Sequence, residues 1–152
     1  MTPIERRNKA ESLFLEGYNC AQAVFLSFCD ELNIDEKSAL RISSSFGGGM
    51  GRLREVCGAV SGMFMAAGVL FGYDDPNAKD EKTEHYARLQ ALAARFKEIN
   101  GSIICRELLS PEQAGSGHTP EERTSAYYKK RPCKLLVGDA AQILQEYIDS
   151  QR

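Results

Sequence analysis

The chain has 152 residues, of which 43% are hydrophobic, and this size suits one compact domain over residues 1–152 that folds without disulfide staples. Its formal net charge is −2 with basic and acidic residues spread along the chain, which argues against a nucleic-acid partner. Residues 1–7 are polar and carry no apolar signal core, so we expect a cytoplasmic protein whose thiols stay reduced.

The N-terminal part of the chain predicts three helices. A first helix over about 3–16 begins with proline, a favoured first-turn residue, and stops at a glycine. Asn19 can cap a second helix over about 20–32, in which apolar residues recur at the spacing of a buried stripe. Asp35 can cap a third, short helix over about 36–42, which gives way to serines and a glycine run.

The longest uncharged stretch covers 56–73 and is close to the minimum length for crossing a bilayer. We reject a membrane segment because the stretch contains several glycines and its neighbours are amphipathic helices. It predicts a central buried helix over about 54–71. Gly58, Gly62 and Ala66 recur at every fourth position of that helix and would let another helix approach closely.

The C-terminal half continues the helical pattern. A long helix is expected over 78–99, ended by Asn-Gly, and a short one over 103–109. Residues 112–125 are rich in Gly, Ser, Pro and Glu and predict a surface loop or flap, after which a last helix covers about 133–147. No alternating β pattern is present. We therefore predict an all-α, single-domain bundle of about five to seven helices.

Three of the five cysteines fall at predicted helix N-termini: Cys20, Cys57 and Cys133. Free backbone N–H groups and the positive end of the helix dipole favour the thiolate there, so these thiols should be more acidic than a free cysteine. Basic neighbours favour the thiolate in the same way; they are Arg52 and Arg54 before Cys57, and Lys130, Arg131 and Lys134 around Cys133.

The other two cysteines differ from each other. Cys105 stands next to Arg106 in a short helix of its own, so its surroundings are also positive. Cys29 lies nine positions after Cys20, and at about 100° per residue the two point to opposite faces of one helix. We therefore interpret Cys29 as a small core or surface residue outside any shared site.

The sequence resembles the small bacterial and archaeal proteins of the C_GCAxxG_C_C family, which are named for dispersed cysteines and described as redox-active. The segments that carry the resemblance are Gly17-Tyr18-Asn19-Cys20-Ala21-Gln22-Ala23-Val24, Phe46-Gly47-Gly48-Gly49-Met50-Gly51, Cys57-Gly58-Ala59-Val60-Ser61-Gly62, Ile104-Cys105-Arg106-Glu107-Leu108-Leu109 and Cys133. The family's cysteines fall on Cys20, Cys57, Cys105 and Cys133, whereas Cys29 has no counterpart. The resemblance implies a redox role without naming a substrate.

The remaining motifs are weak. The glycine run 47–51 has no preceding strand and no following Lys-Ser/Thr pair, so it is not a nucleotide-binding fingerprint, and we expect it to let the backbone turn tightly beside Cys57. His85 is expected to be a solvated helix residue. His118 lies in the predicted flap, where it could close over a cysteine site.

Three functional hypotheses stay open. In the first, Cys20, Cys57, Cys105 and Cys133 gather in one thiol redox site, with Cys57 as the nucleophile, no cofactor, and a redox partner protein or small thiol as its substrate. In the second, the same four thiolates bind zinc or an iron–sulfur cluster. In the third, the cysteines are structural and the bundle binds a protein partner or a second copy of itself.

Overall fold

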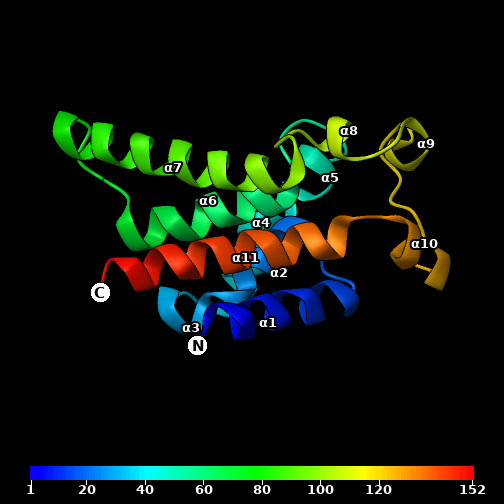
Figure 1. Ribbon diagram of the computed structural model, residues 1–152, viewed down its shortest axis with the longest axis horizontal. Coiled ribbons are helices and arrows are strands. Elements are labelled where there is room, and N and C mark those ends of the chain that lie inside the picture. Colours follow the sequence, from blue (N-terminus) through cyan, green and yellow to red (C-terminus); the bar gives the residue numbers. More distant parts are fainter.

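The computed structural model describes residues 1–152, and helices are its only regular elements, which confirms the all-α prediction (Figure 1). In chain order the helices are α1 (Pro3–Leu15), α2 (Cys20–Ser27), α3 (Cys29–Leu32), α4 (Glu36–Ser44), α5 (Gly47–Met50), α6 (Gly58–Phe71), α7 (Lys79–Asn100), α8 (Cys105–Leu108), α9 (Pro111–Ala114), α10 (Ser125–Lys130) and α11 (Cys133–Ser150).

There are more helices than the predicted five to seven because the chain breaks at points that periodicity does not show. The second predicted helix is divided at Phe28, whose backbone leaves the helical region, into α2 and α3. Cys20 and Cys29 therefore belong to different helices, and the geometric argument that placed them on one helix was wrong. The glycine run forms the single turn α5, and the predicted flap is bounded by the short helices α9 and α10.

Helices α1, α6, α7 and α11 run along roughly one common direction, and the short helix α3 lies near the N-terminus (Figure 1). Helix α11 lies against α1 and also contacts α2, α6 and α7. Helices α5, α8, α9 and α10 lie at the end of the molecule opposite both chain termini (Figure 1). That end also holds the starts of α6 and α11, so the helix N-termini that carry the cysteines face the same region.

The sequence predicted that the central helix begins at about Arg54, but helix α6 begins at Gly58. The preceding residues are not helical because Arg54 has a φ of +60° and Val56 forms an antiparallel bridge with Ile104. Within α6, one face is buried against α2 and α11. None of the helices combines the length and the apolar character that a bilayer crossing requires.

Two glycines of α6 form a matched pair for testing helix packing. A Cβ atom on Gly62 would lie 2.6 Å from the carbonyl oxygen of Ala21 in α2, whereas a Cβ atom on Gly68 would meet nothing within 4 Å. Gly62→Ala is therefore expected to lower the free energy of unfolding by about 1–3 kcal/mol, because two backbones must separate. Gly68→Ala should raise it by about 0.5–1 kcal/mol through helix propensity. Urea unfolding measures both, and equal effects of the two changes would contradict the packing argument.

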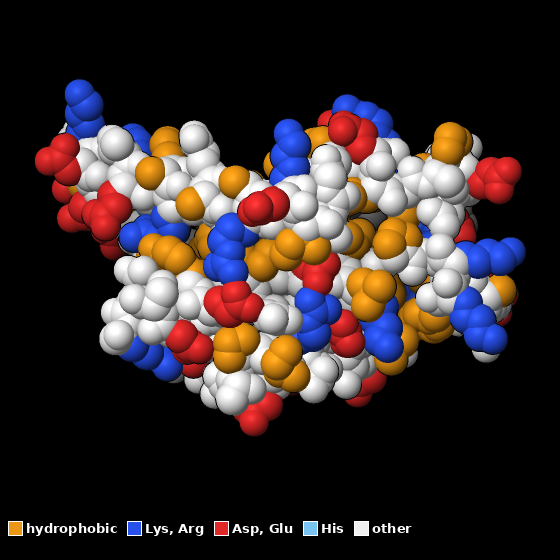
Figure 2. Space-filling view, in the orientation of Figure 1, with side chains coloured by type: hydrophobic (Ala, Val, Ile, Leu, Met, Phe, Trp, Pro, Cys, Tyr) orange, Lys and Arg blue, Asp and Glu red, His pale blue; other side chains and the backbone are white.

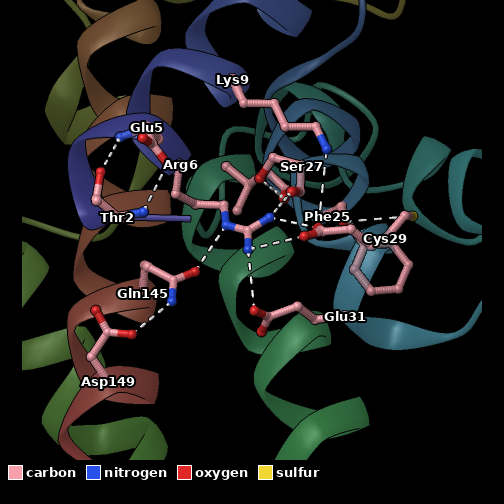
Figure 3. A network of polar contacts seen from close by, with 12 residues as sticks. Thr2, Glu5, Arg6, Lys9, Phe25, Ser27, Cys29, Glu31, Gln145 and Asp149 are labelled. Carbon is pink, nitrogen blue, oxygen red and sulfur yellow. Dashed lines mark hydrogen bonds and ion pairs between the residues drawn. The ribbon is translucent and has the colours of Figure 1, made fainter.

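A polar network joins the start of α1 to α2, α3 and α11 (Figure 3). Its centre is Arg6, whose side chain is fully buried. Arg6 Nε donates to Gln145 Oε1 at 2.9 Å, Nη1 donates to Asp30 Oδ1 at 2.6 Å, and the guanidinium lies 4.5 Å from the Phe28 ring centroid. Nη1 also donates to the carbonyl oxygen of Ser27. The network fixes the relative positions of helices that support the opposite, cysteine-bearing end.

Candidate thiol site

The four cysteines of the predicted set line one cavity of about 60 Å³. Cys20, Cys105 and Cys133 are the first residues of α2, α8 and α11, and Cys57 is the residue that precedes α6. All four therefore lie at helix starts, including Cys105, for which the sequence was less clear. The cavity has room for about four water molecules, so it suits the reacting end of a small molecule better than a large cofactor.

Backbone pairing between distant segments holds Cys57 beside Cys105. The N–H of Cys57 donates to the carbonyl oxygen of Ile103 at 2.8 Å, and the N–H of Cys105 donates to that of Glu55 at 2.6 Å. The antiparallel bridge between Val56 and Ile104 lies between these two bonds. Because extended residues alternate their side-chain directions, the pairing brings Cys57 and Cys105 to the same side of the bridge.

Two glycines let other parts of the chain approach the cysteines. A Cβ atom on Gly49 would lie 2.7 Å from Cys105 Cβ and 2.8 Å from Arg54 Cα, and its φ of +70° also disfavours a side chain. A Cβ atom on Gly58 would lie 3.0 Å from Cys20 Cβ. The glycine run thus turns tightly beside Cys105, not beside Cys57 as the sequence had suggested. Gly58, next to Cys57 in the chain, brings α6 close to Cys20.

Cys133 is the acidic thiol of the cavity. A hydrogen bond from Cys20 and the positive charge of Arg131 outweigh burial and lower the pKa of Cys133 to about 7. The same contact acts oppositely on its partner, because the hydrogen bond to Cys133 and burial raise the pKa of Cys20 well above its ordinary value. Near pH 7, Cys133 is therefore about half ionised while Cys20 stays a neutral thiol of the same cavity.

Cys57 and Cys105 are also less acidic than a free cysteine. The acidity expected from the helix starts of Cys20 and Cys57 was therefore wrong, as was that expected from the positive surroundings of Cys105. Burial raises the pKa of Cys57 to about 12, although the N–H groups of Ala59 and Val60 act in the other direction. Burial also raises the pKa of Cys105, opposed by Arg54, whose Nη1 lies 3.7 Å from Cys105 Sγ. Arg54 thus faces Cys105 and not Cys57. At Cys57 the loss of water outweighs the helix dipole.

These positions correspond to a known sequence pattern. The profile of the family described as "Putative redox-active protein (C_GCAxxG_C_C)" matches residues 18–147, a range that contains all four cavity cysteines. The chain belongs to the C_GCAxxG_C_C family. Curated proteins and solved structures gave no match to the chain.

Cys29 lies outside this site of the C_GCAxxG_C_C protein. It is partly exposed at the start of α3, its Sγ is 4.0 Å from the carbonyl oxygen of Phe25, and it does not line the cysteine cavity. Burial and the charge of Glu36 raise the pKa of Cys29. Cys29 is therefore a weakly acidic thiol that can serve as an internal control.

Arg123 and Tyr127, which the sequence analysis did not single out, complete the wall together with Arg131, which it had named as a basic neighbour of Cys133. The guanidinium of Arg123 donates to the carbonyl oxygens of Phe14 at 2.6 Å and Tyr18 at 2.8 Å. Arg131 stacks 4.6 Å from the Tyr127 ring centroid. Only Tyr127 of the three lies in a helix, α10, so helical spacing in the sequence could not have grouped them.

Neither histidine lines the cysteine cavity. His85 is 7% exposed rather than solvated, because it packs edge-on to Tyr73 and its Nδ1 lies 2.9 Å from Arg88 Nη1. Burial and the charge of Arg88 lower the pKa of His85. His118 lies in the wall of a second, adjoining cavity.

The zinc or iron–sulfur hypothesis requires Cys20, Cys57, Cys105 and Cys133 to be grouped as ligands. The structure has no group of three or more Cys, His, Asp or Glu side chains placed to hold a metal ion. The residues therefore do not fit the predicted tetrathiolate set, and we derive no step through a metal.

Proposed function

We propose that this protein carries out thiol–disulfide exchange, with Cys133 as the attacking thiol and Cys20 as the resolving thiol. The observation that carries the proposal is that Cys20 and Cys133 open α2 and α11 in the wall of one cavity. Their interaction there moves their pKa values in opposite directions. A thiol attacks best when its pKa is near the ambient pH, and a resolving thiol must be close to the attacked sulfur. The sequence had favoured Cys57 as nucleophile, but a pKa of about 12 leaves it almost wholly protonated.

The exchange proceeds in two balanced steps. The Cys133 thiolate attacks one sulfur of a substrate disulfide, which forms a mixed disulfide and releases the other half of the substrate as a thiolate. Cys20 then loses its proton to solvent and attacks Cys133 Sγ, which forms the Cys20–Cys133 disulfide and releases the second half. Two protein thiols are oxidised and one disulfide is reduced to two thiols, and the reverse sequence oxidises a dithiol substrate.

Cys57 and Cys105 have a supporting role in this proposal. Both are buried, and burial disfavours their charged forms. As neutral thiols they add no negative charge beside Cys133, whereas a second thiolate in the cavity would raise its pKa.

The proposal predicts which disulfide forms first. Reduced protein treated with one equivalent of oxidised glutathione should form the Cys20–Cys133 disulfide, with Cys57, Cys105 and Cys29 still free to alkylating reagents. Peptide mapping by mass spectrometry identifies the pair. In Cys20→Ser the reaction should stop at the mixed disulfide of Cys133 with glutathione, because the resolving thiol is missing.

Two results would count against the proposal. One is a first disulfide that excludes Cys133. The other is stoichiometric zinc or iron in the purified protein together with protection of all four cavity thiols from alkylation, which would favour the metal hypothesis.

A further inference from the structure

A second cavity of about 250 Å³ adjoins the cysteine cavity. The two share Asn19, Gly48, Arg54, Arg123, Tyr127 and Arg131 in their walls. The second cavity, which we call the outer cavity, contains no cysteine; the charged or titratable residues that it adds are Arg52, His118 and Glu121. A molecule seated in the outer cavity would therefore reach the thiols past Arg54, Arg123 and Arg131.

The arginines of the outer cavity carry charge that the protein does not neutralise. Arg131 pairs with Glu121, but Arg52, Arg54 and Arg123 have no carboxylate within ion-pair distance. Their side chains donate to neutral groups instead: Arg52 to the carbonyl of Gly117, Arg54 to that of Ala114, and Arg123 to the carbonyls of Phe14 and Tyr18. Three unpaired positive charges thus line one cavity of a chain whose net charge is −2.

This arrangement differs from the charge distribution on the face shown in Figure 2. On the face shown in Figure 2, lysine, arginine and acidic side chains are interspersed and no single-sign patch covers a large area. Most other arginines are in ion pairs, for example Arg6 with Asp30, Arg7 with Asp139 and Arg95 with Glu146. Unpaired arginines in a concave site are the groups that bind carboxylate, sulfonate or phosphate through several N–H donors.

We infer that the outer cavity binds the anionic group of a small thiol or disulfide and so presents its sulfur to Cys133. The inference rests on the proposed function, because it names the substrate class of the same thiols. The substrate is a low-molecular-weight compound with at least one negatively charged group beside its sulfur. Its charge is held by Arg52, Arg54 and Arg123, and its sulfur enters the smaller cavity.

Substitution of Arg52 tests substrate recognition without changing the acidity of Cys133. Arg52 lines the outer cavity but not the cysteine cavity, whereas Arg54 and Arg131 line both and lower the pKa of Cys133. Arg52→Gln should therefore weaken the preference for anionic substrates without moving the pH midpoint of Cys133. The matched control is Lys79→Gln, which removes one positive charge from an exposed residue at the start of α7, far from the short helices (Figure 1).

The test compares two aromatic disulfides of different charge. Dithiobis(2-nitrobenzoate) carries two carboxylates, and 2,2′-dithiodipyridine is neutral at pH 7. For Arg52→Gln we expect the rate constant with the anionic probe to fall about 3- to 10-fold at low salt, with less than about 2-fold change for the neutral probe. Lys79→Gln should change neither. A rate ratio between the two probes that is the same in the wild type and Arg52→Gln would overturn the inference.

A binding measurement tests the cavity without thiol chemistry. S-methylglutathione is an anionic thioether that cannot exchange, and it should bind Cys133→Ser in calorimetry with a Kd that rises about 3- to 10-fold when Arg52→Gln is added. Binding that depends on Arg52, in a protein that exchanges with neither probe, would keep the anion site and reject the thiol function. If Arg52→Gln changes the exchange rates of the anionic and the neutral probe equally, and the thioether does not bind, the anion site is rejected and the thiol function is kept.

Discussion

Cys133→Ser is expected to remove the fast-reacting thiol of the protein. In a Cys29→Ser background, which excludes the partly exposed fifth cysteine, the rate of iodoacetamide modification at pH 7 should fall by roughly 5-fold or more, because burial raises the pKa of each remaining cavity thiol. With a pKa of about 12 against about 7, Cys57 holds ~10⁵-fold less thiolate than Cys133 at pH 7. The higher intrinsic nucleophilicity of a less acidic thiol recovers only about 10²-fold of this difference. Stopped reactions analysed by mass spectrometry give the rate for each cysteine.

The pH dependence identifies the same residue. Since the folded pKa of Cys133 lies below that of a free cysteine, its modification rate should be half-maximal near pH 7 and level above pH 8. Unfolding the protein in urea should move the midpoint up to the ordinary range of about 8.5. The Cys29→Ser protein alone should keep the fast phase. A fast phase that survives Cys133→Ser would show that another cysteine attacks.

Cys20 provides a further control on the cause of this acidity. Cys20→Ala removes the hydrogen bond that contributes most to lowering the pKa of Cys133, so the midpoint should rise. Cys20→Ser keeps a hydroxyl that can donate to the thiolate, so the midpoint should stay nearer to that of the wild type. Equal midpoints in the two variants would assign the acidity to Arg131 instead.

The sequence was sufficient to predict helix starts and ends, because these are decided by neighbouring residues. Asn19 Oδ1 accepts from the N–H of Gln22 and Asp35 accepts from the N–H of Ser38, as expected of helix-capping residues. Pro3 occupies the first turn of α1, and Gly101 ends α7 in the left-handed conformation. These signals act within four residues, so one sequence is enough to find them.

The features that the sequence did not predict depend on contacts between distant segments. The pairing of Val56 with Ile104 shortens α6 and fixes Cys57, but neither segment shows an alternating pattern that would predict it. The prediction that the Cys57 thiol is acidic was wrong for a related reason. The helix start of Cys57 is readable from the sequence, whereas its burial results from several helices packing around it, and burial decided the sign.

The sequence analysis named Arg52, Arg54 and Arg131 only as neighbours of single cysteines, and it did not group them in one wall because they come from different parts of the chain. Arg52 and Arg54 follow the glycine run with φ of +66° and +60°, a conformation that costs about 1–2 kcal/mol for a residue other than glycine. Their side chains cross to carbonyls of Gly117 and Ala114 in the segment that the sequence predicted to be a flap. A composition rich in Gly, Ser and Pro indicated a loop but not the surface on which the loop lies.

The largest loss of stability is expected from Arg6→Met, at the end of the molecule away from the thiols. The Arg6 side chain is fully buried and bonds to Gln145, Asp30 and the carbonyl of Ser27. Methionine fills much of the same volume but leaves these acceptors without a donor, so the free energy of unfolding should fall by about 3–5 kcal/mol. That is a large fraction of the roughly 5–15 kcal/mol that stabilises a typical domain. Urea unfolding should show a lower midpoint with an unchanged slope.

Lys9→Met is the matched control, because Lys9 Nζ lies 4.0 Å from the same Asp30 carboxylate but its side chain is 36% exposed. An exposed pair contributes at most about 1 kcal/mol, so this variant should unfold close to the wild type. Asp30 is itself 40% exposed and can be solvated when Arg6 is lost, whereas the fully buried Gln145 cannot. Adding Gln145→Leu to Arg6→Met should therefore recover part of the loss, and a double variant less stable than Arg6→Met would contradict this account.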